Sequence, residues 1–182
     1  RKPQRIVFTE GDNYRILKAA EILIANGVAK PILLGAISKM ESIIEEYQLE
    51  LDGAEFIDII ANSEGREKYA NDMYALRKRA GWTLAECRSK IKSREYYGNM
   101  MLREGAADAL ISGLTVKYPT ALRPILSIIG MEEGIRKAAG MYTLLTKRGP
   151  MFFADTTINL DPTVDDLVQM VLNVADAVKR TN

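Results

Sequence analysis

The sequence contains no histidine among its 182 residues. Imidazole is the usual base of Ser-His-Asp and Cys-His arrangements, so those mechanisms, and histidine-ligated metal sites, are excluded for this chain. The single cysteine, Cys87, cannot form an intrachain disulfide, which fits a reducing compartment. Cys87 stands in a helix-forming segment without a nearby base, so we expect it to serve packing rather than nucleophilic catalysis.

The sequence also lacks a charge excess and long apolar runs. The sequence has 25 Lys and Arg residues and 24 Asp and Glu residues, so there is no basic excess of the kind that nucleic-acid binding requires. Apolar runs such as 151–154 are far shorter than a membrane-spanning helix, and we recognise no signal peptide. We therefore expect a cytoplasmic protein with neither nucleic acid nor membrane as a partner, and any bound anion must be held locally.

The first part of the chain alternates short apolar runs with helical patterns. Such alternation predicts a three-layer α/β sandwich with a mostly parallel sheet and helices on both faces. The charged segment 64–103 predicts two or three further helices, with Thr83 and Glu86 spaced as a capping box. The expected strands are 5–8, 31–35, 55–60 and 107–111, with helices at 16–27, 40–47 and 122–129, the last stopped by Gly130 and either started late or bent by Pro124.

The pattern changes after residue 138. Two apolar runs flank Lys147-Arg148-Gly149-Pro150, which predicts a β-hairpin. Asp161-Pro162 is then expected to cap a final helix with one apolar stripe, formed by Leu167, Met170, Val171, Val174 and Val178. We predict a first α/β domain at 1–138 and the start of an incomplete second domain at 139–182, since a strand is expected to follow the last helix.

Three turns that follow strands are candidate sites, because ligands of open α/β sheets bind beyond the carboxyl ends of the strands. In Glu10-Gly11-Asp12 we favour a helix cap by Asp12 over a binding role. The turn at 112–118 precedes a helix, where free backbone N–H groups, hydroxyls and cations can hold a phosphate. The residues of interest there are Ser112, Gly113, Thr115, Lys117, Tyr118 and Arg123.

The third turn, 155–159, clusters Asp155, Thr156, Thr157 and Asn159, which loop capping explains as well as a ligand site does. The sequence has neither the Gly-x-Gly-x-x-Gly dinucleotide fingerprint nor a P-loop. The residues alone predict an α/β domain with a candidate anion site, and they indicate no more specific function.

Several strings resemble the phosphate acetyl/butyryltransferase family, in order from about residue 5 to 180. They are Ala107–Gly113, Leu122–Leu126, Ile128–Gly130 and Phe153–Asp155 followed by Asn159 and Pro162, together with the segments 5–11, 30–35 and 97–101. The resemblance implies a two-domain fold of the isocitrate dehydrogenase type that is usually dimeric and binds an acyl-CoA in a cleft. It also implies that Arg123 contacts the phosphate or thioester region, with Ser112 and Gly113 as backbone wall. The family's catalytic serine, arginine and aspartate belong mainly to a part that follows this chain, so no catalytic residue is assigned.

Within that family, Lys117 and Tyr118 resemble the branch fused to bacterial NADP-dependent malic enzymes, where true transferases tend to carry small hydroxyl residues. The first reading is therefore an acetyl-CoA-binding regulatory domain. The oxidation of malate to pyruvate, with NADP and a divalent metal, would reside in an N-terminal part that this chain does not contain. The alternatives are a catalytic phosphate acetyltransferase and a dimerisation module without a ligand. The length of the parent is expected to separate the first two, because a fusion is more than twice as long.

Overall fold

The computed structural model describes residues 2–155 and 157–181. The chain divides into two compact units, Arg1–Gly130 and Met131–Asn182. The predicted domain boundary after residue 138 stays a prediction, because compact packing does not by itself define a folding domain.

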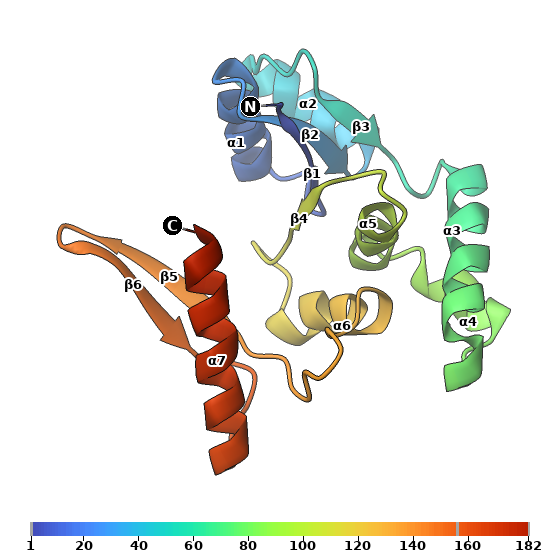
Figure 1. The fold of residues 1–182 in the computed structure, drawn as a ribbon. Helices are drawn as coiled ribbons and strands as arrows, with labels where there is room; N and C mark the ends of the chain where they lie inside the picture. The colour runs from blue at the N-terminus through green and yellow to red at the C-terminus, as the bar shows by residue number, and fades with distance from the viewer. Residues whose placement is uncertain (1, 156, 182) are drawn as a thin grey trace. The chain divides into compact units, whose positions relative to one another are not determined.

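The first unit contains a four-stranded parallel sheet (Figure 1). The strands lie in the order β3-β2-β1-β4, and all three neighbouring pairs are parallel. Their bounds are Gln4–Phe8 for β1, Ala29–Leu34 for β2, Glu55–Ile57 for β3 and Ala109–Ile111 for β4. The four predicted strands are confirmed, although β3 ends earlier than expected. There the Asp58 carboxylate accepts the N–H groups of Ile60 and Ala61, which turns the chain out of the sheet.

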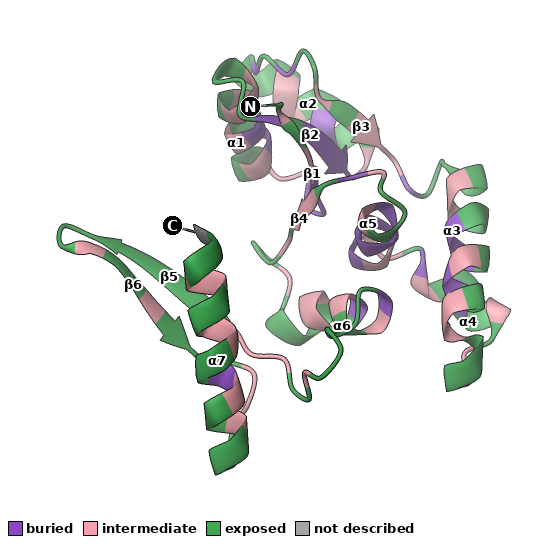
Figure 2. Cartoon of the chain, viewed as in Figure 1, coloured by how far each residue is buried: buried purple, intermediate pink, exposed green. Residues whose placement is uncertain are grey.

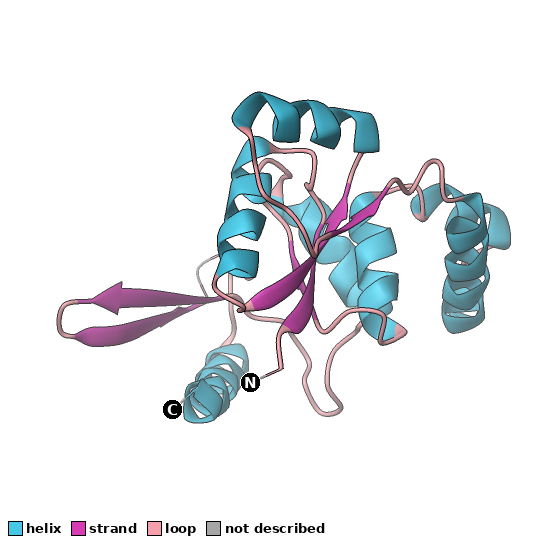
Figure 3. Cartoon of the chain, turned by 90° about the horizontal axis from the view of Figure 1, so that it is seen from above, coloured by secondary structure: helices cyan, strands magenta, loops and turns pink. Residues whose placement is uncertain are grey.

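Helices cover both faces of this sheet, as the alternation of strand and helix patterns along the chain predicts (Figure 3). Phe8 and Leu33 point to one face, where they pack with residues of α1 (Tyr14–Ala25) and α2 (Ile37–Tyr47). Val7 and Ile32 point to the other face. The helices that pack there are α3 (Ser63–Arg77), α4 (Leu84–Lys90), α5 (Arg94–Arg103) and α6 (Tyr118–Ile128), and a 3-10 turn, η1, spans Lys78–Ala80. Figure 2 shows the buried residues concentrated on β1, β2 and α5.

Two helix ends in this unit test the sequence predictions. The capping box is confirmed, because the Glu86 carboxylate accepts the Thr83 N–H at 2.9 Å while the Thr83 hydroxyl accepts the Glu86 N–H at 3.2 Å. Helix α6 begins at Tyr118, with Pro119 in its first turn, so Pro124 lies inside the helix and does not delay its start. A proline in the first turn leaves no N–H unsatisfied, which is why the helix can begin there.

The described residues of the second unit form a hairpin and one helix. Strands β5 (Met141–Thr146) and β6 (Gly149–Ala154) pair antiparallel, as predicted, and α7 spans Val164–Thr181. The prediction that Asp161-Pro162 caps α7 is wrong. Thr163 precedes the helix, and its hydroxyl accepts the N–H of Asp166 while the Asp166 carboxylate accepts the Thr163 N–H. Among residues 2–155 and 157–181, no helix combines the length and hydropathy needed to cross a bilayer.

The apolar stripe of α7 is only partly covered within its own unit. Met170 is 5% exposed, whereas Leu167 is 50% and Val171 68% exposed. Figure 2 shows β5, β6 and much of α7 as exposed. Further exposed apolar residues of α7, outside the predicted stripe, are Val164, Val168 and Leu172.

We expect the purified 182-residue chain to self-associate through this stripe. Burying it is worth roughly 5 to 10 kcal/mol at about 25 cal/mol per Å² of apolar surface, which favours the association of two copies. Sedimentation velocity of the wild type and of Leu167→Lys/Val171→Lys measures the effect. The double variant should shift toward the monomer, and a wild type that sediments as a clean monomer would contradict the prediction.

Candidate functional site

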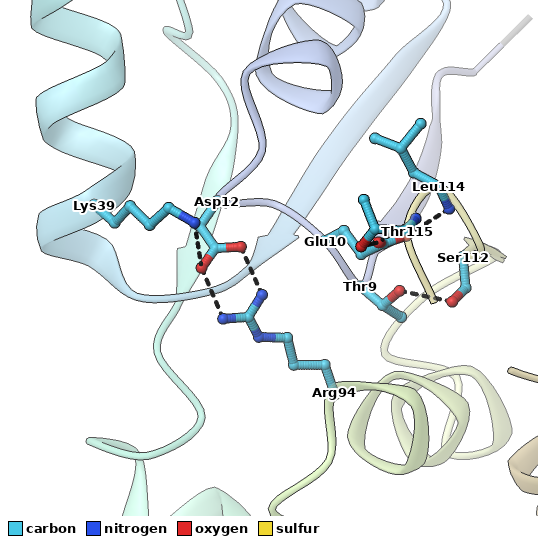
Figure 4. A network of polar contacts seen from close by, with 8 residues as sticks. All are labelled: Thr9, Glu10, Asp12, Lys39, Arg94, Ser112, Leu114 and Thr115. Carbon is cyan, nitrogen blue, oxygen red and sulfur yellow. Dashed lines mark hydrogen bonds and ion pairs between the residues drawn. The ribbon is translucent and has the colours of Figure 1, made fainter. Parts of the chain in front are cut away.

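The candidate site lies where the chain leaves β1 and β4. These strands are parallel neighbours, so their carboxyl ends meet at one edge of the sheet, which is where open α/β sheets bind ligands. The Thr9 N–H donates to the Ile111 carbonyl at 3.2 Å. The Thr9 hydroxyl donates to the Ser112 hydroxyl at 2.9 Å (Figure 4). Residues 103 positions apart in the chain are thereby joined.

The turn after β4 binds an anion, and that anion is the protein's own Glu10. Its carboxylate accepts the N–H groups of Gly113 at 3.1 Å, Leu114 at 2.7 Å and Thr115 at 2.7 Å, and also the Thr115 hydroxyl. Glu10 is buried, with 7% of its surface exposed. The expectation of free backbone N–H groups in this turn is therefore wrong for 113–115, because a strand-end carboxylate occupies them.

These hydrogen bonds keep Glu10 ionised. Burial of the carboxyl raises its pKa. The hydrogen bonds from the Thr115 hydroxyl and from the three backbone N–H groups lower the pKa by more than burial raises it, so the net pKa lies below the ordinary value. A buried carboxylate is tolerated only when its lone pairs are satisfied in this way.

The acidic turn after β1 also differs from the expectation. Asn13, not Asp12, caps α1, since the Asn13 side chain accepts the Arg15 N–H at 3.0 Å. Asp12 instead forms a two-point ion pair with Arg94 at 2.6 and 2.8 Å, and Lys39 lies 3.7 Å from the same carboxylate (Figure 4). The hydrogen bonds from Arg94 are the largest cause that lowers the Asp12 pKa. Arg94, Lys39 and the pairing role of Asp12 were missed by the sequence analysis.

These groups surround one open pocket of about 410 Å³ at the carboxyl edge of the sheet. It is lined by both acids and bases, so it favours a ligand with polar groups of both kinds over a purely apolar one. Its charged and hydroxyl-bearing lining includes Glu10, Asp12, Lys39, Arg94, Glu95 and Thr115. Within the described residues, no three aspartate, glutamate or cysteine side chains gather in a way that would hold a metal ion.

The cations and the phenol predicted for this site lie on α6 and its cap. Lys117 is the N-cap residue and makes no side-chain cap, and Tyr118, the first helical residue, is 44% exposed. Arg123 is exposed, and its guanidinium makes no ion pair with any residue in 2–155 or 157–181, while its carbonyl accepts the Ser127 hydroxyl at 2.7 Å. The structure thus brings Gly113 and Thr115 together with Glu10, and Ser112 together with Thr9, and it leaves the three larger side chains open to solvent.

The third predicted cluster lies in the second unit and holds a loop together. The Asp155 carboxylate accepts the N–H groups of Gly140 at 2.9 Å, Ile158 at 3.2 Å and Asn159 at 2.8 Å. The Asn159 side-chain amide also donates to Asp155 and to the Ala138 carbonyl. Burial raises the pKa of Asp155, but these hydrogen bonds prevail and lower it to about 2. Loop capping therefore accounts for Asp155 and Asn159, and Thr156 lies outside the described residues.

The family model for phosphate acetyl/butaryl transferases matches residues 1–182, the whole chain. This chain belongs to that family. The resemblance to this family that short strings of the sequence indicated is thereby confirmed.

Two solved structures are similar as well. A phosphotransacetylase from Streptococcus pyogenes superimposes with a TM-score of 0.84 at 27% identity, over 98% of this chain and 54% of its own. The EutD phosphotransacetylase from Staphylococcus aureus gives a TM-score of 0.80 at 28% identity, over 92% and 50%.

Curated relatives of two kinds match the chain equally well. An NADP-dependent malic enzyme from Salmonella typhimurium is 34% identical over 181 residues, which are 98% of this chain and 24% of the relative. A phosphate acetyltransferase from Thermoanaerobacterium thermosaccharolyticum is 34% identical over 182 residues, or 97% of this chain and 55% of the relative. The chain therefore spans about half of one relative and about a quarter of the other.

One expectation about these relatives has to be corrected. The chain also covers only 25% of a phosphate acetyltransferase from Synechocystis, at 33% identity. That share is close to its share of the malic enzymes. Long parents therefore occur in both groups, and the length of the parent does not separate a malic-enzyme fusion from a transferase.

Proposed function

We propose that this phosphate acetyltransferase-like domain binds an acyl-CoA, with acetyl-CoA as the first candidate, and regulates a malic enzyme of which it is a part. The oxidative decarboxylation of malate, with NADP and a divalent metal, would belong to a separate part of that parent. The domain's own ligand would be the acyl-CoA, and its partner a second copy of the protein.

The observation that carries the regulatory reading is the pair Lys117 and Tyr118 at the start of α6, where the chain differs from the transferases, which tend to carry small hydroxyl residues there. A transferase must bind inorganic phosphate as a second, small substrate. Tyr118 is 44% exposed, and its bulky phenol can occupy space that such a substrate needs. The hydrogen bonds of Glu10 to the 113–115 turn do not decide between the two readings, because segment 5–11 resembles the transferases as well.

The side chains around α6 support an acyl-CoA as that ligand. Lys117 and Arg123 are exposed cations on one short segment, and a CoA carries several phosphate charges that such cations attract. Tyr118, 44% exposed at the start of α6, offers a flat apolar ring with a hydroxyl beside them. Lys117, Tyr118 and Arg123 are the proposed ligand contacts, and Ser112, Gly113 and Thr115 form the wall behind them.

Catalysis of acetyl transfer between CoA and phosphate is the second candidate. It is favoured by the exposed Arg123, whose guanidinium has no ion-pair partner within the described part of the chain and is free to grip an anion at two points. It is also favoured by the two similar solved structures, both of which are phosphotransacetylases. The two candidates differ in one measurable respect: only the second turns acetyl-CoA and phosphate into acetyl phosphate and CoA.

We expect the 182-residue chain by itself to form no acetyl phosphate from acetyl-CoA and phosphate. It corresponds to 55% of the transferase from Thermoanaerobacterium thermosaccharolyticum, and no catalytic group of the transfer reaction is assigned within it. Release of free CoA thiol, followed with a thiol reagent, measures the reaction, and the phosphate acetyltransferase from Thermoanaerobacterium thermosaccharolyticum assayed alongside provides the positive control. Turnover by the 182-residue chain well above a blank without protein would contradict the prediction.

A further inference from the structure

The conformation of the turn at 112–117 is held by hydrogen bonds rather than by apolar packing. Most of its residues are exposed to solvent: Leu114 is 40% exposed, and Gly113, Thr115 and Lys117 are exposed as well. Apolar burial therefore contributes little to holding this turn in place. The backbone of Gly113 also adopts φ +102°, a conformation that glycine tolerates and other residues rarely adopt.

The Glu10 carboxylate supplies what packing does not. Three consecutive N–H groups and one hydroxyl of the turn converge on its two oxygens. Figure 4 shows Leu114 and Thr115 beside Glu10. Hydrogen bonds to an ionised acceptor are stronger than neutral ones, and removing the acceptor would leave all three N–H groups of the turn without their partner. The conformation of 113–115 thus depends on one side chain that is 103 to 105 residues distant in sequence.

The backbone on both sides of Glu10 is fixed by hydrogen bonds to neighbouring strands. Glu10 directly follows β1 and Thr9, both tied to the neighbouring strands, and the Gly11 N–H donates to the Leu34 carbonyl at 2.9 Å. A Cβ on Gly11 would lie 2.9 Å from the Leu33 carbonyl carbon, so the chain passes β2 in close contact. The sheet therefore fixes the position of the Glu10 backbone, and the Glu10 carboxylate in turn fixes the turn through its hydrogen bonds.

We infer that Glu10 is a positioning residue: it fixes the 112–117 turn and thereby sets where Lys117 and Tyr118 stand at the start of α6. This role rests on the proposed function insofar as the ligand is an acyl-CoA, and the fixation of the turn holds independently of the ligand. Glu10 need not touch the ligand, because Thr115, which it binds, is two residues from the N-cap of α6.

Two measurements on Glu10→Ala test the role, both on the full-length protein. The first is acetyl-CoA affinity by calorimetry, without and with sodium acetate. Acetate supplies the missing carboxylate and can reach the cavity, because Glu10 lines an open pocket. We expect Glu10→Ala to bind acetyl-CoA at least about tenfold more weakly, and added acetate, but not chloride at equal ionic strength, to restore affinity. A residue that merely stabilised the fold would not be rescued by acetate.

The second measurement is amide hydrogen exchange. In the wild type the N–H groups of Leu114 and Thr115 should be protected, and in Glu10→Ala they should exchange faster while Val7 and Phe8 in β1 keep their protection. Glu67→Ala is the matched control, because it removes another bonded carboxylate, one that pairs with Arg88 on α4 and does not contact the turn. Glu67→Ala should change neither acetyl-CoA affinity nor exchange at 114–115.

Protection at 114–115 that survives in Glu10→Ala, or acetyl-CoA affinity equal to that of the wild type, would overturn the positioning role. If Glu10→Ala also lost protection in β1, the same pair of measurements on Glu10→Gln would decide, since glutamine keeps the volume while removing the charge. A wild type that does not bind acetyl-CoA would reject the proposed function, and the exchange data would then decide the role of Glu10 by themselves.

Discussion

Replacing Arg123 with alanine in the full-length parent is expected to weaken acetyl-CoA binding by about 1.5 to 3 kcal/mol, roughly ten- to a hundredfold. The guanidinium is exposed on α6 and is not engaged by any carboxylate in the described residues, so its charge is available to a ligand. A planar fork of N–H donors grips phosphate or carbonyl oxygens at two points, which explains the size of the expected loss. Calorimetric titration with acetyl-CoA measures it.

Two controls make the Arg123 result specific. Lys30→Ala removes an exposed cation near the amino end of β2, at the opposite edge of the sheet, and should leave the affinity unchanged. Malate-dependent NADPH formation without acetyl-CoA should hardly change in Arg123→Ala, and its loss would mean that Arg123 supports assembly. Tyr118→Ala, assayed alongside, tests the neighbouring ring. An acetyl-CoA affinity of Arg123→Ala equal to that of the wild type would end the assignment.

Replacing Gly11 with alanine is expected to lower the free energy of unfolding by about 3 kcal/mol, the upper part of the range for forcing a methyl group into packed space. The new Cβ would lie 2.9 Å from the Leu33 carbonyl carbon and from the Leu34 nitrogen. Both atoms belong to β2, which is paired on both sides and cannot shift without disturbing the sheet. Urea unfolding followed by circular dichroism measures the change.

Gly27→Ala is the matched control for Gly11→Ala. A Cβ at Gly27 meets no atom within 4 Å, but the residue has φ +62°, so alanine there should cost only about 1 to 2 kcal/mol of backbone strain. Gly11 has no such backbone requirement, and its penalty is steric. Equal losses of stability in the two variants would show that the close approach of the β1 turn to β2 is not tight in solution.

The elements of the fold were predictable because they depend on nearby residues. Short apolar runs that alternate with helical patterns identified all four parallel strands, and the hairpin around Lys147-Arg148 followed from two apolar runs at a short separation. The errors lie where a side chain competes with the pattern. Asp58 turns the chain and shortens β3, and Thr163, nearer to the helix than Asp161, caps α7.

The candidate site was predictable only in outline. The position of the turn after β4 followed from the strand pattern, but its partner did not, because Glu10 meets Leu114 only if β4 lies next to β1. Local periodicity does not determine strand order. The pair between Asp12 and Arg94, 82 residues apart, was missed for the same reason. A usable signal was present: an acidic residue directly after an apolar strand, at the same sheet edge as a glycine-containing turn, can fill that turn.

The most direct test of the regulatory account is malate-dependent NADPH formation by the full-length parent, measured as acetyl-CoA is titrated. The account predicts that the rate changes along a saturation curve with acetyl-CoA, and that Arg123→Ala shifts the curve to higher concentrations. A rate of NADPH formation that stays constant over the whole acetyl-CoA range, or no malate-dependent formation of NADPH at all, would contradict it.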